Sequence, residues 1–197
     1  MWQLVLYVNP FTVLLFVLGT VAFSLTFCRW SASRPDRGVK AARSLFRLCL
    51  AVVLVATLMP TEPIGSGVRN VWLTPGDGLV GPGVADLFPQ ERRMVLALTI
   101  ANAAMFVPLG VLWYGIAKGA PALTAVTGCS LLSVGIEAVQ FLMNAGRIVD
   151  IDDVLFNTAG AVIGALVAAT SHALSGRDAR AHRAPRRAVP RKPRLSR

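Results

Sequence analysis

Charged residues are scarce in this chain of 197 residues: Asp, Glu, Lys and Arg together make up 15% of it, while 54% is hydrophobic. A soluble domain carries roughly 25% charged residues, so the composition excludes a soluble enzyme. Cysteines number only three and show no paired spacing, which indicates neither a disulfide framework nor a zinc site. We expect no metal and no cofactor. The mean hydropathy of +0.59 is typical of a membrane protein.

Long apolar runs supply most of the remaining sequence. About 20 mainly apolar residues are needed for a helix to cross the hydrocarbon layer of a bilayer. Four runs reach this length, namely 4–27, 95–114, 122–143 and 151–173. A further run, 45–59, is shorter than this and contains Arg47.

The distribution of basic residues favours counting the weak run as a span. With five spans and the N-terminus outside, sixteen of the 20 Lys and Arg residues lie on the cytoplasmic side and four lie outside. Basic residues in short loops favour the cytoplasmic face. The sequence therefore predicts an all-α, polytopic membrane helical bundle with five transmembrane helices in the plasma membrane. Its N-terminus is expected outside and its C-terminus in the cytoplasm.

Composition also divides the chain into four regions. Residues 1–60 hold two transmembrane helices, 61–93 form an external Pro- and Gly-rich loop, 94–174 form a three-helix core and 175–197 form a basic tail. We expect the loop to be a solvated connector, with a lid over an external site as the alternative. The Arg-, Ala- and Pro-rich tail is expected to be disordered. Its expected partner is the anionic inner leaflet, not nucleic acid.

Glu137 lies inside the apolar run 122–143, where an acidic group costs roughly 2.5 to 3.5 kcal/mol on insertion scales. Gln140 and Asn144 follow it at the spacing of one helix face. A polar stripe on a transmembrane helix is expected to face the interior of the bundle. This spacing therefore predicts a polar surface that faces neighbouring helices.

The last run begins with a similar stripe. Asp150, Asp153 and Asn157 share one helix face, whereas Asp152 is expected to point towards water. Gly160 and Gly164 continue the face as a small-xxx-small pair, which lets another helix approach closely.

The apolar run 95–114 contains Asn102, Pro108 and Gly110. Pro108 removes a backbone hydrogen bond, so we expect a kink there. At 1.5 Å per residue, Asn102, Glu137 and Asn157 all fall roughly 9 to 10 Å below the outer boundary. We therefore predict an outward-opening polar pocket, with the alternative that these side chains form a purely structural network. Its floor is Asn102, Glu137 and Asn157, Gln140 lies above them, and Arg147, Asp150 and Asp153 form the mouth.

In these residues the chain resembles the VanZ-like family of small bacterial membrane proteins. The resemblance covers about residues 95–173, and it implies a role in the cell envelope and reduced sensitivity to teicoplanin. It implies no settled chemistry. The pattern consists of Asn102, the run 106–110 (FVPLG), the run 137–140 (EAVQ), Arg147, Asp150, Asp153, Asn157 and Gly160.

Three functions remain open at this point. The favoured one is a non-enzymatic envelope protein that binds a lipid-linked cell-wall precursor or a lipoglycopeptide in the pocket. The second is a membrane enzyme that acts on a lipid headgroup with carboxylates as acid, base or metal ligands. The third is a proton-linked transporter or flippase, for which five spans would favour a homodimer.

Overall fold

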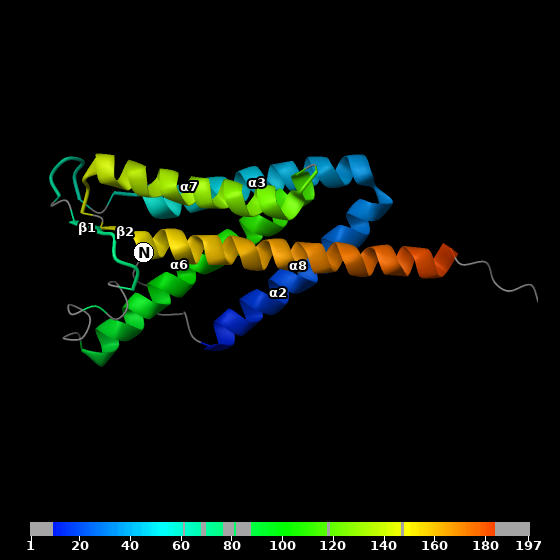
Figure 1. Cartoon of the computed structure of the whole chain (residues 1–197), viewed down its shortest axis with the longest axis horizontal. Helices are drawn as coiled ribbons and strands as arrows, with labels where there is room; N and C mark the ends of the chain where they lie inside the picture. The colour runs from blue at the N-terminus through cyan, green and yellow to red at the C-terminus, as the bar shows by residue number, and fades with distance from the viewer. Residues whose placement is uncertain are drawn as a thin grey trace, which may run out of the picture.

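The computed structural model describes residues 10–60, 62–67, 70–76, 81, 88–117, 119–146 and 148–183. Within these residues the chain is a bundle of long helices with one pair of short strands at one end (Figure 1). The elements are α2 (Pro10–Ser33), α3 (Pro35–Leu58), β1 (Asn70–Trp72), α6 (Pro89–Ile116), α7 (Pro121–Met143), β2 (Ile148–Asp150) and α8 (Ile151–Arg183).

Four of these helices are long and apolar enough to cross a membrane, which confirms a helical membrane bundle. They are the segments Asp36–Leu58, Pro89–Ile116, Pro121–Met143 and Ile151–Ser175. The first predicted span, 4–27, begins outside the described residues. The count of five spans therefore stays a prediction.

The weakest predicted span is stronger in the structure than its sequence indicated. Instead of a 15-residue segment it is the 24-residue helix α3, and most of the predicted cytoplasmic segment 28–44 is helical. Ala, Lys and Arg are good helix formers, so this stretch extends both neighbouring helices. The two helices are separated at Arg34 because α3 begins with Pro35. Proline is favoured in the first turn of a helix, where its missing amide hydrogen costs no hydrogen bond.

The tail also differs from the prediction of disorder from residue 175 onwards. Helix α8 continues to Arg183, well beyond its membrane-spanning part. Ala and Arg have high helix propensity, and a long preformed helix removes the cost of nucleating a new one. Residues 184–197 lie outside the described part of the chain.

Helices α6 and α8 run in the same direction and pack with their backbones in close contact. A Cβ added at Gly160 would meet the carbonyl oxygen of Ala103, and one added at Gly164 would meet that of Val107. A Cβ at Gly110 would in turn lie 2.6 Å from the carbonyl oxygen of Ala161. These three glycines lie where the backbones of α6 and α8 approach each other. Helix α6 continues through Pro108 without interruption.

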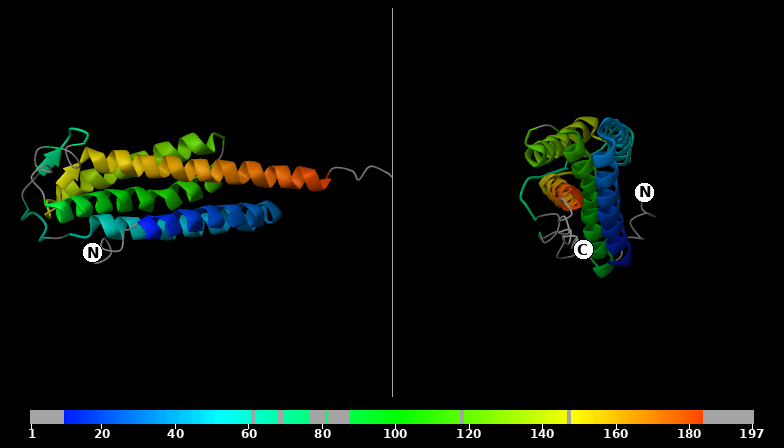
Figure 2. Two further views of the ribbon diagram at one scale, coloured as in Figure 1. Left: turned by 90° about the horizontal axis from the view of Figure 1, so that it is seen from below. Right: turned by 90° about the vertical axis from the view of Figure 1, so that its right-hand side faces the viewer.

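Helices α3, α6, α7 and α8 lie together in the bundle (Figure 2), and apolar side chains from all four form one core. Burial of such side chains is worth about 1.5 to 3 kcal/mol each where the alternative is water. In a bilayer, close packing supplies most of the attraction between helices. The core consists of Val53, Phe106, Leu109, Cys129, Ile136 and Ala161.

The outer segment makes backbone contacts with the rest of the fold, although most of its described residues are exposed. Its role as a connector or as a lid stays a prediction. Strand β1 pairs in parallel with β2, with Val71 opposite Val149. The amide of Gly65 donates to the carbonyl of Met143 (3.0 Å), and the amide of Gly67 donates to that of Asn144 (3.0 Å). The segment therefore folds over the turn between α7 and α8. Its backbone amides donate to carbonyl groups of this turn, because a buried amide without a hydrogen-bond partner costs free energy.

Candidate functional site

The polar side chains predicted to converge lie at the end of the bundle that carries β1 and β2. The shortest contact among them joins α6 to α8, where the Asn102 side-chain amide donates to the Asp153 carboxylate at 2.6 Å. Both residues are half-buried. A hydrogen bond from an amide to an ionised carboxylate is stronger than one between two neutral groups. This contact joins the two helices about two turns before Gly160 on α8.

Glu137 reaches from α7 to the start of α8. Its carboxylate accepts a hydrogen bond from the backbone amide of Asp150 at 3.2 Å, and its side chain is 6% exposed. The Asp150 carboxylate in turn accepts from the amide of Asp152 at 2.9 Å. This is the geometry of a helix N-cap. Asp150 therefore has a structural role in starting α8, beside any role at a mouth.

Asn157 lies one turn beyond Asp153 on α8, and it is 4% exposed. Its amide donates to the hydroxyl of Ser133 on α7 at 2.8 Å, while its carbonyl oxygen Oδ1 is buried without a hydrogen-bond partner. A buried acceptor left without a donor costs about 1 to 3 kcal/mol. The sequence analysis does not include Ser133, although its position four residues before Glu137 on the same helix face is a signal that could identify it. Oδ1 of Asn157 is thus an open acceptor inside the polar cluster.

Gln140 is buried, and its side-chain amide donates to the backbone carbonyl of Thr57 on α3 at 2.9 Å. This hydrogen bond joins α3 to α7. Its predicted place above the floor of a pocket stays a prediction. Arg147, predicted at the mouth, lies outside the described residues.

Asp152 contradicts the prediction that it points to water. Its carboxylate is buried and accepts two contacts from the backbone amide of Gly76, at 2.8 and 3.1 Å. Helical spacing placed Asp152 away from α6 and α7, and that part was correct. Its partner is the outer segment, whose fold no periodicity in the sequence indicated.

Polar side chains of α6, α7 and α8 thus make successive contacts at this end, while the outward-opening pocket stays a prediction. Asn102 meets Asp153, Glu137 meets the amide of Asp150, and Asn157 meets Ser133. Within the described ranges, no three His, Cys, Asp or Glu side chains are placed to hold a metal ion.

The contact between Asp152 and Gly76 predicts a measurable change in the outer segment. Asp152→Ala removes a charged acceptor, a contact worth about 1.5 to 3 kcal/mol, so the open population of this segment should rise tenfold or more. Limited trypsin digestion of the purified protein, followed at Arg69, should be correspondingly faster. Glu62→Ala is the charge-matched control, because the backbone amide of Glu62 keeps its bond to Ala145. Equal digestion rates for Asp152→Ala and the unaltered chain would contradict a docked segment.

Comparison with known proteins adds one finding. The family model VanZ/LLP1 matches residues 11–172. This match includes α2 and α3, which the resemblance found in the sequence did not cover. No curated protein and no solved structure matches the chain. Its four apolar helices make it a multi-pass membrane protein, and the family match over most of its length shows that the chain belongs to the VanZ/LLP1 family.

Proposed function

We propose that this protein is a non-enzymatic component of the bacterial cell envelope that binds the polar headgroup of an amphiphile at the end of the bundle that carries β1 and β2. The amphiphile is a lipid-linked cell-wall precursor or a lipoglycopeptide, and its retention lowers sensitivity to glycopeptides. The observation that carries the proposal is the convergence of Asn102, Glu137, Asp153 and Asn157 from three helices under a folded outer segment.

The chemistry of the cluster supports a ligand that donates hydrogen bonds. Carboxylates are acceptors only, and Oδ1 of Asn157 is an acceptor without a donor. Sugar hydroxyls and amino groups supply such donors. Large apolar side chains on the outer face of α7, among them Leu131, Val134 and Leu142, are exposed and offer a surface for an acyl chain.

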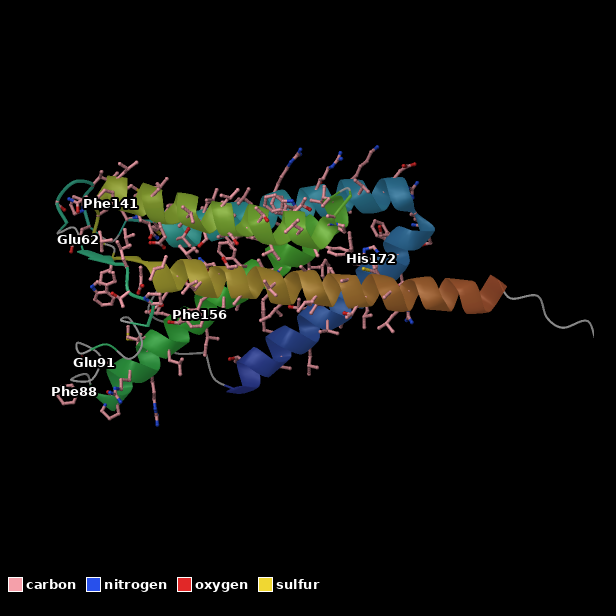
Figure 3. The ribbon with its side chains drawn as sticks, viewed as in Figure 1. Glu62, Phe88, Glu91, Phe141, Phe156 and His172 are labelled. Carbon is pink, nitrogen blue, oxygen red and sulfur yellow. The ribbon has the colours of Figure 1, made fainter. Side chains whose placement is uncertain are left out.

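The charge distribution supports an orientation with this end outside. Glu62 and Glu91 lie towards the end with β1 and β2, whereas His172 lies towards the opposite end of α8 (Figure 3). The junction of α2 and α3 and the end of α8 carry many of the basic residues. Because basic segments favour the cytoplasm, the α2–α3 junction and the C-terminus would face the cytoplasm.

A substitution that changes charge but not shape tests the proposal. Glu137→Gln keeps one carbonyl oxygen towards the amide of Asp150 and removes the negative charge. In a glycopeptide-sensitive bacterium that expresses the protein, we expect the minimum inhibitory concentration of teicoplanin to fall to that of cells without it. The amount of protein in the membrane should stay the same.

The matched control is Ser130→Ala on the same helix. The Ser130 hydroxyl contacts Thr158 of α8 at 3.0 Å, so it also joins α7 to α8, but it lies further from the acidic end. This variant should keep full protection. Protection that survives in Glu137→Gln would contradict the proposal. Binding of teicoplanin, of a glycopeptide without an acyl chain and of a lipid-linked precursor to the purified protein then identifies the ligand.

A further inference from the structure

A cavity lies away from the polar cluster, at the basic end of the bundle between α3 and α6. Its volume is about 320 Å³, within the range of small-molecule sites. It forms where the first half of α3 passes the last turn of α6. Its lining residues are Arg43, Phe46, Arg47, Trp113, Ile116 and Ala117.

The aromatic part of the cavity is held in place by three helices. The rings of Phe46 and Trp113 meet edge to face, with centroids 5.2 Å apart. Gly128 of α7 makes room for the indole, because a Cβ added there would lie 2.8 Å from Cε2 of Trp113 and closer still to other ring atoms. Trp113 is therefore fixed between α3 and α7. Indole rings are favoured at the boundary between hydrocarbon and headgroups.

The charged part consists of Arg43 and Arg47, which are one helical turn apart and both exposed. Both lie in the middle part of α3 but beside the end of α6, and an arginine stem can cover apolar surface while its charged head extends to the headgroup layer. Two guanidinium groups side by side match the oxygens of a phosphate, which arginine binds bidentately. The end of α6 adds carbonyl groups without partners inside the helix, which suit headgroup hydroxyls.

We propose that this cavity binds the headgroup of an anionic phospholipid, with the phosphate on Arg43 and Arg47 and the glycerol against Trp113 and the end of α6. The apolar neighbours Phe46 and Ile116 then border the first part of the acyl chains. Placement of this lipid in the inner leaflet depends on the orientation proposed above. Binding itself does not depend on that orientation or on the function of the polar cluster.

Native mass spectrometry of the purified full-length protein with equal amounts of phosphatidylglycerol and phosphatidylcholine tests this site. We expect one phosphatidylglycerol to be retained preferentially. Since each basic residue near a membrane surface contributes about 1 kcal/mol, Arg43→Gln/Arg47→Gln should lower its apparent affinity roughly 20- to 30-fold. Arg34→Gln/Arg37→Gln removes the same charge from the same region outside the cavity and should change the affinity less than threefold.

Each other result overturns the proposal. Equal retention of both lipids by the unaltered protein would show no headgroup site, and this measurement needs no variant to fold. Equal losses in the two double variants would show general attraction to a basic surface. Displacement of the lipid by millimolar inorganic phosphate or glycerol phosphate would show a site for a free anion. Melting temperatures of both variants without added lipid establish that they are folded.

Discussion

Gly160→Ala should lower the melting temperature of the purified protein by about 2 to 12 °C. The added Cβ would lie 2.9 Å from the carbonyl carbon and 3.2 Å from Cα of Ala103, and closer still to the carbonyl oxygen. Those atoms belong to the backbone of α6, so they cannot move aside as the end of a flexible side chain does. Overpacking costs about 1 to 3 kcal/mol, and each kcal/mol corresponds to about 2 to 4 °C in a chain of this length.

Gly135→Ala is the matched control because nothing lies within 4 Å of a Cβ added there. Alanine is about 1 kcal/mol better than glycine inside a helix, so this variant should melt at the same or a higher temperature. The helix-propensity gain is the same in both variants, and their difference isolates the contact with α6. A Gly160→Ala protein as stable as Gly135→Ala would contradict the close packing of α6 and α8.

Much of the three-helix core follows from spacing along the chain. Gly160 and Gly164 lie on one helix face with Asp153 and Asn157, so the sequence predicts that one surface both approaches a neighbour closely and carries its polar contacts. Asn102 was placed at the depth of that surface by counting residues from the outer boundary. The contacts of Asn102 with Asp153 and of Gly160 with Ala103 agree with this count.

What the sequence could not predict depends on segments without periodicity. The strand formed by residues 70–72 is three residues long, too short to be distinguished from a turn, and its partner is distant in sequence. The partner of Asp152 is a backbone amide of this same segment, and a backbone donor leaves no residue-type signal. Gln140 likewise meets a backbone carbonyl of α3. Side-chain patterns therefore located the helices, while the contacts of the outer segment needed the tertiary structure.

The coupling free energy between Asn102 and Asp153 can show whether their contact involves a charged group or is an ordinary polar contact between helices. Polar contacts between membrane helices average about 0.6 kcal/mol in measured double-mutant cycles and rarely exceed about 1.7. A hydrogen bond to a charged group is worth about 1.5 to 3 kcal/mol. If Asp153 is ionised, a cycle of Asn102→Ala, Asp153→Ala and the double variant should give a coupling free energy of unfolding of at least about 1.5 kcal/mol.

The Ser130–Thr158 pair supplies the neutral reference for this cycle. Its two hydroxyls join α7 to α8 in the same bundle and carry no charge, so the corresponding cycle should give a coupling near the average of about 0.6 kcal/mol. Asp153→Asn should bring the coupling with Asn102 down to the same level, because the acceptor remains and its charge does not. Equal couplings for both pairs would mean that Asp153 is neutral or well solvated, and the acidic end would then attract amino groups and sugars no better than a structural network does.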